Sequence, residues 1–301
     1  VGEVAEVEKK NNVGEVAEVE KKDIVVRIED TVTKDEDTVA EKKVIVTKDQ
    51  VDEFRSLTMQ RNEKIAMASL SWVGGNVEDA IEHYDKNQQH YMSPTQCRAN
   101  ELRVKALYMR YANDPKDALP GKIGPNGVSR LLNELKLNAE DRKVLVLAYK
   151  LNAEIQCEFS ALEWGKGMMQ MGVDSVASLR IRLDQIDERL REPSQFKPLY
   201  LFTFTFGKSA AERNLDLDVA LIYWKILFKD QFSLLPLWEE YLTTVHKKAV
   251  TRDVWNLLLD FLSFTKEDLS DFDEDAAWPS VLDEFVKWAR SRMAGDAMQE
   301  A

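Results

Sequence analysis

Two aspartates stand near the starts of two amphipathic segments at the C-terminal end of this 301-residue sequence. Asp253 follows Thr251, which suits a helix cap, and Asp283 follows Pro279, which suits the first helical position. A carboxylate in the first turn of a helix can interact with the macrodipole, and Asp283 can also pair with Lys287 one turn on. If both are free, they can instead accept charge-assisted hydrogen bonds from lysine or arginine of a partner. The residues alone leave these alternatives open.

Helical spacing of apolar residues predicts the two helices that must position these aspartates. The inward face of the first helix carries Val254, Trp255, Leu258, Leu259 and Leu262. The inward face of the second carries Val281, Leu282, Phe285, Val286 and Ala289. Upstream, from Gln96 to about Ala294, one amphipathic segment follows another. This pattern predicts an all-α fold.

A nucleophilic cysteine would suit an enzyme that transfers a modifier, and the sequence has Cys97 and Cys157. Cys157 would need a base and a lowered thiol pKa, but no motif links it to the histidines, which are His83, His90 and His246. We expect Cys157 to be buried as a small hydrophobic residue. Two cysteines form neither a zinc motif nor a disulfide framework, which favours a reducing compartment, the nucleus and cytoplasm. The sequence therefore predicts no catalytic residue, no metal site and no cofactor.

Two loops between helical segments have the spacing of calcium-binding EF-hand loops. In the first, aligned on Gly121, the ligand positions fall on residues without side-chain oxygens: Lys116, Ala118, Pro120 and Gly127. In the second loop, Cys157 replaces the turn glycine. The candidate ligands there are Asn152, Glu154, Gln156, Ser160 and Glu163, and only the two glutamates carry carboxylates. We expect two degenerate EF-hand-like packing units that need no calcium. A calcium sensor remains an alternative function.

Composition argues against several broad classes of function. The formal net charge of −12 argues against a nucleic-acid binder, and no apolar run reaches the ~20 residues of a membrane-spanning helix. We therefore expect no nucleic-acid partner and no membrane partner. Residues 1–49 lack aromatic residues and contain VGEVAEVEKK twice, so we expect a disordered acidic tail that buries too little apolar surface to fold. The runs at 24–28 and 44–46 could form short strands within it.

Residues 50–92 contain three short amphipathic segments that resemble a ubiquitin-associated (UBA-like) domain. Three large side chains there have two possible roles: Met59, Trp72 and Tyr84. They either fill a very small core or contribute to a shallow apolar surface that binds ubiquitin. The residues leave both roles open.

Several longer motifs occur in order along the chain: QCEF at 156–159, FTFTF at 202–206, LDLDVALIYW at 215–224, WNLLLDF at 255–261 and AWPSVLDEFV at 277–286. Together they resemble the defective-in-cullin-neddylation family over about residues 50–293. The resemblance implies a UBA-like domain followed by a PONY (DCUN) domain. It also implies a buried helix for FTFTF, which by its alternation alone would be a strand, and we expect Pro193 and Pro198 to interrupt the chain before it. Family members are co-ligases, not enzymes, that help transfer a ubiquitin-like modifier onto cullins.

The resemblance assigns two binding surfaces to this sequence. Its cullin-binding patch of Asp, Ala and Asp falls on Asp253, Ala277 and Asp283, where the small residue lets a basic segment approach. Its pocket for the N-terminally acetylated neddylation conjugating enzyme falls on Val128, Val144, Leu147, Gln156, Cys157, Phe159, Phe206, Tyr223 and Ile226. Acetylation removes the terminal charge, so the methionine can enter an apolar site without burying an ammonium group. The RING subunit of the cullin complex is a further implied partner.

We therefore predict an all-α protein in which a three-helix UBA-like domain precedes a larger helical domain built on two degenerate EF-hand-like units. The expected boundaries are a tail at 1–49, the UBA-like domain at 50–92, the PONY (DCUN) domain at 98–293 and a C-terminal tail at 294–301. The predicted function is that of a non-catalytic scaffold co-ligase for cullin neddylation in the ubiquitin-ligase complex. A ubiquitin-binding adaptor is the other alternative, besides the calcium sensor.

Overall fold

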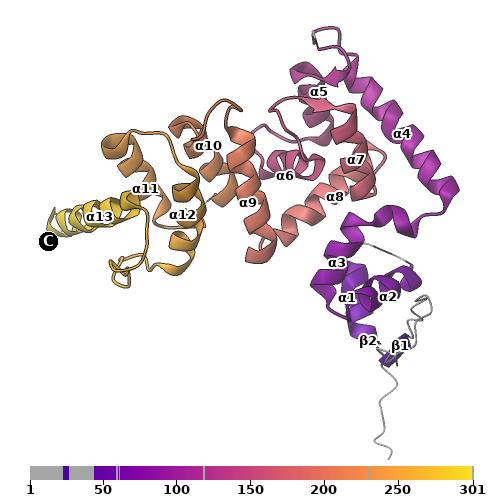
Figure 1. The fold of residues 1–301 in the computed structure, drawn as a ribbon, viewed down its shortest axis with the longest axis horizontal. Coiled ribbons are helices and arrows are strands. Elements are labelled where there is room, and N and C mark those ends of the chain that lie inside the picture. Colours follow the sequence, from indigo (N-terminus) through magenta and orange to yellow (C-terminus); the bar gives the residue numbers. More distant parts are fainter. Residues whose placement is uncertain are drawn as a thin grey trace, which may run out of the picture. The chain divides into compact units, whose positions relative to one another are not determined.

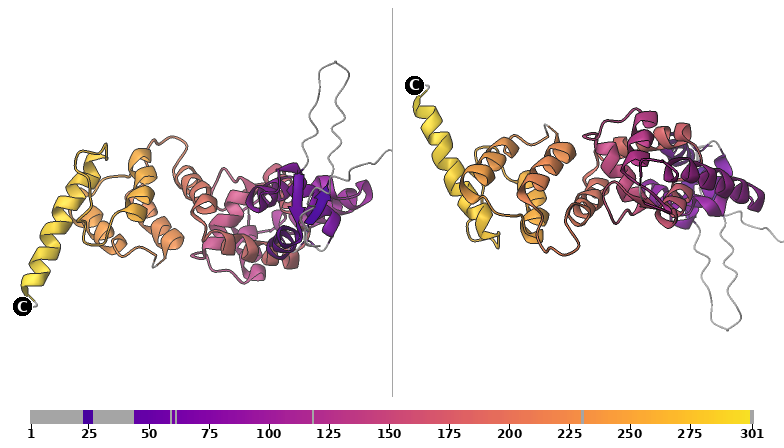
Figure 2. Two further views of the ribbon diagram at one scale, coloured as in Figure 1. Left: turned by 90° about the horizontal axis from the view of Figure 1, so that it is seen from below. Right: turned by 90° about the horizontal axis from the view of Figure 1, so that it is seen from above.

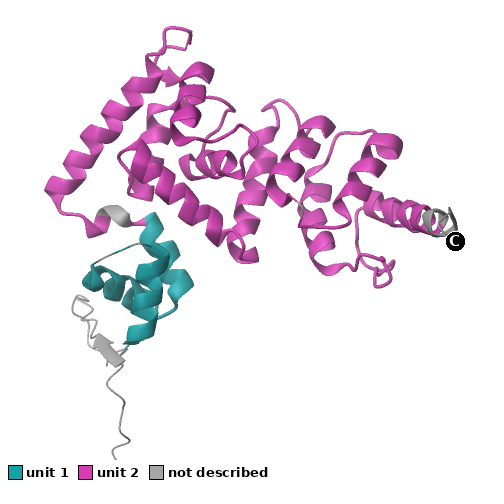
Figure 3. Ribbon diagram, turned by 180° about the vertical axis from the view of Figure 1, so that it is seen from behind, with its two compact units in different colours: residues 1–86 teal, residues 87–301 magenta. Residues whose placement is uncertain are grey.

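The computed structural model describes residues 23–26, 44–58, 60, 62–117, 119–229 and 231–299, and the chain divides into two compact units after Lys86 (Figure 3). Helices dominate the described residues of both units (Figure 1), which confirms the predicted all-α fold class. Within the described residues, none of these helices combines the length and apolar character needed to cross a membrane.

The first unit packs three helices around a small apolar core: α1 (Lys48–Thr58), α2 (Glu63–Trp72) and α3 (Val77–Lys86). Phe54 of α1, Leu70 of α2 and Tyr84 of α3 are buried in it. Asn62 caps α2, because its side chain accepts a hydrogen bond from the Lys64 N–H at 3.0 Å. The predicted three helices are confirmed, whereas the UBA-like description of this unit stays a prediction.

Two short strands precede these helices and form an antiparallel pair, in which β1 (Asp23–Val26) runs beside β2 (Val44–Thr47). Val46 of β2 is fully buried. The Gln50 side chain accepts from the Thr47 N–H at 2.8 Å and donates to the Gly75 carbonyl at 2.9 Å. The runs that the sequence offered as possible short strands therefore do form strands, because β-branched residues favour them. The predicted disorder of residues 1–49 does not hold for β1, β2 and the start of α1. The VGEVAEVEKK repeat lies outside the described residues.

The second unit begins with a 3-10 turn, η1 (Gln88–Tyr91), and five helices: α4 (Pro94–Ala112), α5 (Pro125–Leu135), α6 (Arg142–Leu151), α7 (Ala161–Met171) and α8 (Val176–Arg189). Trp164 of α7 is fully buried at the centre of this part. Its indole N–H donates to the Val104 carbonyl of α4 at 3.1 Å. The rings of Tyr108 and Tyr111 of α4 lie 6.4 and 6.2 Å from the Trp164 ring, so one tryptophan joins α7 to α4.

A short antiparallel pair joins the two loops that the sequence singled out, because β3 (Lys122–Ile123) pairs with β4 (Phe159–Ser160). Ile123 lies opposite Phe159. The residue two positions before each of them is left-handed, with φ of 76° at Gly121 and 59° at Cys157. The paired loops and their matched turns agree with two EF-hand-like units, a description that stays a prediction.

Hydrogen bonds within the chain occupy the main carboxylates of both loops. Asp117 accepts from the backbone N–H groups of Asn126 and Gly127, at 2.9 and 2.8 Å, and so caps α5. In the second loop Glu163 accepts from the N–H groups of Glu154 and Ser160, at 2.8 and 2.6 Å. Within the described part of the chain, no group of three or more His, Cys, Asp or Glu side chains could hold a metal ion.

The second unit continues with α9 (Pro193–Gly207), α10 (Leu217–Phe228), α11 (Leu235–Tyr241), a π-helical turn η2 (Leu242–His246), α12 (Arg252–Phe264) and α13 (Ser280–Gln299). FTFTF lies in α9, which confirms that it is helical. Pro193 stands in the first turn, but Pro198 lies inside α9, so the expectation that it interrupts the chain is wrong. Leu199 and Tyr200, which follow Pro198 directly, are both fully buried.

An aromatic cluster holds α9, α10 and α12 together. The Trp255 ring stacks on Tyr200 and Trp224, with centroids 4.7 and 5.2 Å apart. The Tyr200 hydroxyl donates to the Trp255 carbonyl at 2.6 Å and accepts from the Trp224 indole N–H at 3.2 Å. Burial raises the pKa of Tyr200. Because these groups are fully buried and hydrogen-bonded to one another, α12 has a rigid support.

Candidate functional site

Asp253 lies in the first turn of α12 and points away from the core. Thr251 caps this helix as predicted, since its hydroxyl accepts from the Val254 N–H at 3.3 Å. The predicted inward face is confirmed, because all five of its residues are buried. Asp253 is exposed, and its carboxylate forms no hydrogen bond or ion pair with any described residue. It therefore remains available to a partner.

Asp283 has a similar position in the first turn of α13, which begins one residue after Pro279. The Pro279 carbonyl accepts from the Leu282 N–H at 2.8 Å, and the predicted inward face of α13 is buried. Asp283 is half-buried and does not pair with Lys287, so that alternative is wrong. Ala277, in the connection before α13, is exposed.

Aromatic contacts fix α13 and the connection before it against the last turns of α12. The Phe261 ring meets Trp278 and Phe285 edge to face, with centroids 5.9 and 6.0 Å apart. Ala277 adjoins Trp278, and Asp283 lies within one turn of Phe285. Asp253 lies two turns before Phe261, about 12 Å along the helix axis. Asp253 therefore lies at the start of α12, whereas Ala277 and Asp283 adjoin residues that pack against its last turns.

Three cations near this surface interact with other groups of the chain. Lys197 of α9 pairs with Asp260 at 3.0 Å, and Arg290 pairs with Glu274 at 2.7 Å. The Arg252 guanidinium lies over the Phe204 ring, 5.2 Å from its centroid. Six acidic residues and one lysine occupy positions 265–275, so the connection between α12 and α13 is strongly negative. The negative electrostatic potential of this connection favours the approach of a basic segment.

Four residues of the second predicted site come together at the end of α9. The Gln156 side-chain amide donates to the carbonyls of Phe206 and Gly207, at 3.3 and 3.1 Å. Burial, with a smaller contribution from the neighbouring Cys157 thiol, raises the pKa of Tyr223 to about 12. The Gly207 backbone packs so closely on the Tyr223 ring that a Cβ there would lie 2.3 Å from Tyr223 Cε2.

The other predicted pocket residues lie in or against the same core. Five of the nine are buried: Val128, Leu147, Phe159, Tyr223 and Ile226. Val144 and Phe206 are partly exposed, and Gln156 and Cys157 are exposed. The expectation that Cys157 is buried is therefore wrong, because the left-handed loop turn that it occupies faces solvent. Five of the nine predicted residues therefore belong to the apolar core, and the other four are at least partly exposed.

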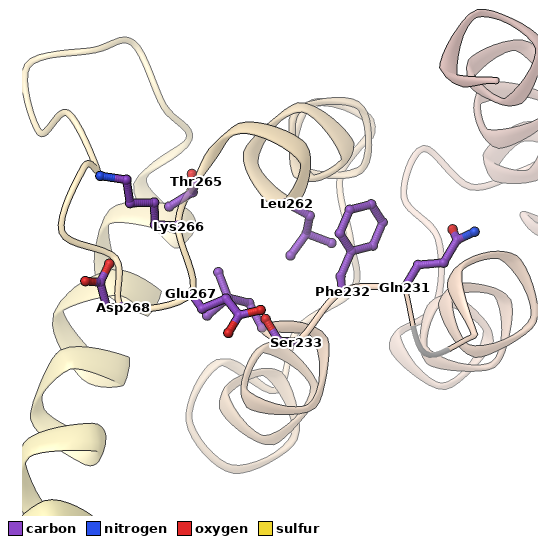
Figure 4. A pocket seen from close by; sticks show the side chains of 9 residues that line it. Gln231, Phe232, Ser233, Leu262, Thr265, Lys266, Glu267 and Asp268 are labelled. Carbon is purple, nitrogen blue, oxygen red and sulfur yellow. The ribbon is translucent and has the colours of Figure 1, made fainter. Parts of the chain in front are cut away.

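Two cavities lie elsewhere, near the connection between α10 and α11. One of 490 Å³ is bounded by Phe232, Leu262 and Thr265, and Figure 4 shows the side chains that line it. The other, of 480 Å³, is bounded by Lys225, Lys229 and Glu239. Sequence analysis missed both, because their linings come from separate loops and helix ends and carry no motif.

Comparison with known proteins matches these elements to one family. The family model for cullin binding matches residues 178–288, a range that includes α12 and the first turns of α13. The chain is 36% identical over 270 residues to defective in cullin neddylation protein 1 of Caenorhabditis elegans, covering 81% of this chain and 91% of that protein.

Two further relatives match over a shorter length. DCN1-like protein 3 of Xenopus tropicalis is 34% identical over 63% of each chain. DCN1-like protein 4 of Drosophila melanogaster is 32% identical over 64% of this chain and 76% of its own. The long match to the nematode protein, which spans nearly all of that relative, decides the assignment, and the chain belongs to the defective-in-cullin-neddylation family.

Proposed function

We propose that this chain binds the C-terminal region of a cullin through Asp253, Ala277 and Asp283 and thereby promotes cullin neddylation. The family assignment supports the role in neddylation. The observation that carries the choice of residues is that both carboxylates lie in first turns of packed helices and have no partner among the described residues. Lysine or arginine of the cullin supplies the missing partners through charge-assisted hydrogen bonds. Exposed Ala277 leaves room for the cullin backbone to approach this surface.

The acetylated N-terminus of the conjugating enzyme occupies the second site in this proposal. In this proposal the uncharged methionine packs on apolar residues of the predicted pocket, such as Tyr223 and Ile226, and exposed Gln156 offers polar groups to the acetylated end. The chain itself is non-catalytic: the thioester belongs to the conjugating enzyme, and the RING subunit of the cullin complex completes the assembly. Holding enzyme and cullin on one scaffold raises the effective concentration of thioester and acceptor lysine.

Calorimetric titration of the full chain with a recombinant cullin C-terminal region tests the carboxylates. We expect Asp253→Ala with Asp283→Asn to weaken binding by at least about tenfold, since two charged contacts are lost. Asp218→Asn is the matched control, because Asp218 is also an exposed aspartate in the first turn of its helix, α10. Unchanged affinity of the double variant would remove this surface from the mechanism.

Ubiquitin binding by the first unit is a second candidate function, favoured by one side chain. Trp72 is 73% exposed and stacks on His83 of α3, with ring centroids 5.4 Å apart, so it does not fill the core. Tyr84, by contrast, is buried, and Met59 lies outside the described residues. Trp72→Ala is expected to abolish the chemical-shift changes that ubiquitin causes in this unit. Identical changes in the variant and the wild type would exclude Trp72 as the contact.

A further inference from the structure

Phe264, in the last turn of α12, is the most exposed of the large apolar side chains that the structure describes, with 80% of its surface accessible. The core does not require it, because α12 already buries six residues on its opposite side: Val254, Trp255, Leu258, Leu259, Phe261 and Leu262. A single exposed apolar side chain is common on protein surfaces, so the case for a contact at Phe264 rests on the residues that share its surface.

Phe264 shares a face of α12 with Asp253. Eleven residues separate them, which is about three turns of 3.6 residues, so the two side chains project in nearly the same direction about 16 Å apart along the axis. Leu257 and Asp260 lie between them on the same face, and we name these four residues the outer stripe of α12. Lys197 neutralises Asp260 at 3.0 Å, so the stripe changes from anionic at Asp253 to apolar at Phe264.

The apolar end of the outer stripe is also the end beside the other two predicted contacts. Phe261, less than one turn before Phe264, packs on Trp278 and Phe285. Ala277 adjoins Trp278, and Asp283 lies within a turn of Phe285. A ligand that reaches from Asp253 to Asp283 along this surface therefore passes Phe264.

We propose that Phe264 is the apolar anchor of the cullin-binding surface and packs on an aliphatic or aromatic cluster of the cullin C-terminal region. The basic residues beside that cluster face Asp253 and Asp283. This inference rests on the proposed function and extends it, since it assigns the apolar contact that the three patch residues do not supply. Hot spots of protein interfaces are commonly a few large side chains, and in this proposal Phe264 is the large side chain of the surface.

The charge of the neighbouring segment favours the cullin over a second copy of this chain as the partner that covers Phe264. Residues 265–275, which follow Phe264, contain six acidic residues and one lysine. Two copies that met through Phe264 would bring two such segments together, and like charges across an interface oppose association. A basic partner gains from the same segment.

Titration of the full chain with a recombinant cullin C-terminal region at several salt concentrations tests the anchor. We expect Phe264→Ala to weaken binding about tenfold with the salt dependence unchanged, because the lost contact is apolar. Asp253→Ala is expected to weaken binding and to flatten the salt dependence. Phe264→Leu should recover most of the affinity. Ile181→Ala, which removes a 54% exposed side chain from α8, is the matched control and should bind like the wild type.

The outcomes separate this inference from the proposed function. If Asp253→Ala weakens binding while Phe264→Ala binds like the wild type, the anchor is wrong and the carboxylate surface stands. If neither variant changes the affinity, the proposed function itself fails. Because Phe264 is exposed, its variants should keep the thermal midpoint of the wild type, and a large fall in that midpoint would overturn its assignment as a surface contact.

Discussion

Asp253 and Asp283 form no ion pair with any described cation, whereas two acidic side chains near them do. Asp260 pairs with Lys197, and Glu274 pairs with Arg290. A carboxylate that is already paired must lose its partner before it can bind another cation, and this cost lowers its value to an interface. The two free aspartates avoid it, so their contribution to binding is large compared with their contribution to folding, which the macrodipole limits to about 0.3–1 kcal/mol each.

Substitution of Gly207 tests how closely the chain packs around Tyr223, a residue of the predicted conjugating-enzyme pocket. An alanine Cβ there would lie 2.3 Å from the Tyr223 ring and 3.0 Å from the Leu215 side chain. We expect Gly207→Ala to lower the free energy of unfolding by about 1–3 kcal/mol through overpacking. It should also weaken binding of the acetylated conjugating-enzyme peptide, because Tyr223 must move.

Gly165→Ala is the control for Gly207→Ala in the same urea-unfolding measurement. A Cβ at Gly165 of α7 meets no atom within 4 Å, so the substitution should stabilise the helix by about 0.5–1 kcal/mol. Equal stability of the two variants would show that Gly207 is not in close contact with Tyr223.

At the scale of elements, the stability of α12 depends on one buried hydroxyl. Tyr200→Phe removes the hydroxyl that donates to the Trp255 carbonyl and accepts from the Trp224 indole N–H. The buried Trp224 N–H is then left without a partner, and the Trp255 carbonyl keeps only its backbone bond within α12. We expect a loss of about 1–3 kcal/mol in the free energy of unfolding. Tyr223→Phe is the control and should be nearly neutral, because the Tyr223 hydroxyl has no hydrogen bond to a described residue. Equal values for both variants would contradict the network.

Acid stability tests the link between the loop after α4 and the middle of α5. A hydrogen bond from Arg130 at 2.9 Å, together with one from the Lys116 N–H, holds the pKa of buried Asp114 below its ordinary value of 3.8. A carboxylate with a lowered folded-state pKa stabilises the fold above its unfolded pKa, and this stabilisation is lost as pH falls through the folded value. The urea midpoint of Asp114→Asn should therefore fall less steeply than that of the wild type below about pH 4. Parallel curves would show that the Asp114–Arg130 pair does not contribute.

The helices were predictable from sequence because their caps and apolar spacing are local signals, as Thr251 and the buried face of α12 illustrate. Three features needed the tertiary structure. The pairing of β1 with β2 joins residues separated by a segment without a turn motif, and Cys157 is exposed because of a left-handed turn that cysteine seldom adopts. Phe264 was overlooked because apolar periodicity identifies residues that face the core and gives no signal for an apolar residue that faces solvent.

For the candidate site, too, the sequence predicted one part and the structure was needed for the rest. Residue type and family resemblance indicated Asp253, Ala277 and Asp283, but their freedom from ion pairs depends on where Lys197, Arg290 and Lys287 lie. Sequence could not decide whether Asp283 pairs with Lys287, because the spacing of the two residues permits it. Only the arrangement of neighbouring helices shows which carboxylates remain available.

At the scale of the whole molecule, the division after Lys86 predicts that the two proposed binding functions are separable. A chain that begins at Asn87 should bind the cullin C-terminal region within about twofold of the full chain, because Asp253, Phe264 and Asp283 all belong to the second unit. It should lose ubiquitin binding entirely. A large loss of cullin affinity in a shortened chain that still unfolds cooperatively would show that the first unit contributes to the cullin contact.

The central claim is that this chain accelerates neddylation by holding a cullin through the free carboxylates of α12 and α13. The most direct measurement is the initial rate at which the charged conjugating enzyme transfers the modifier to a cullin–RING complex, with wild-type chain, with Asp253→Ala Asp283→Asn, and with neither. We predict a marked rate increase with the wild type and a rate near the unassisted value with the double variant. Full acceleration by the double variant would contradict the claim.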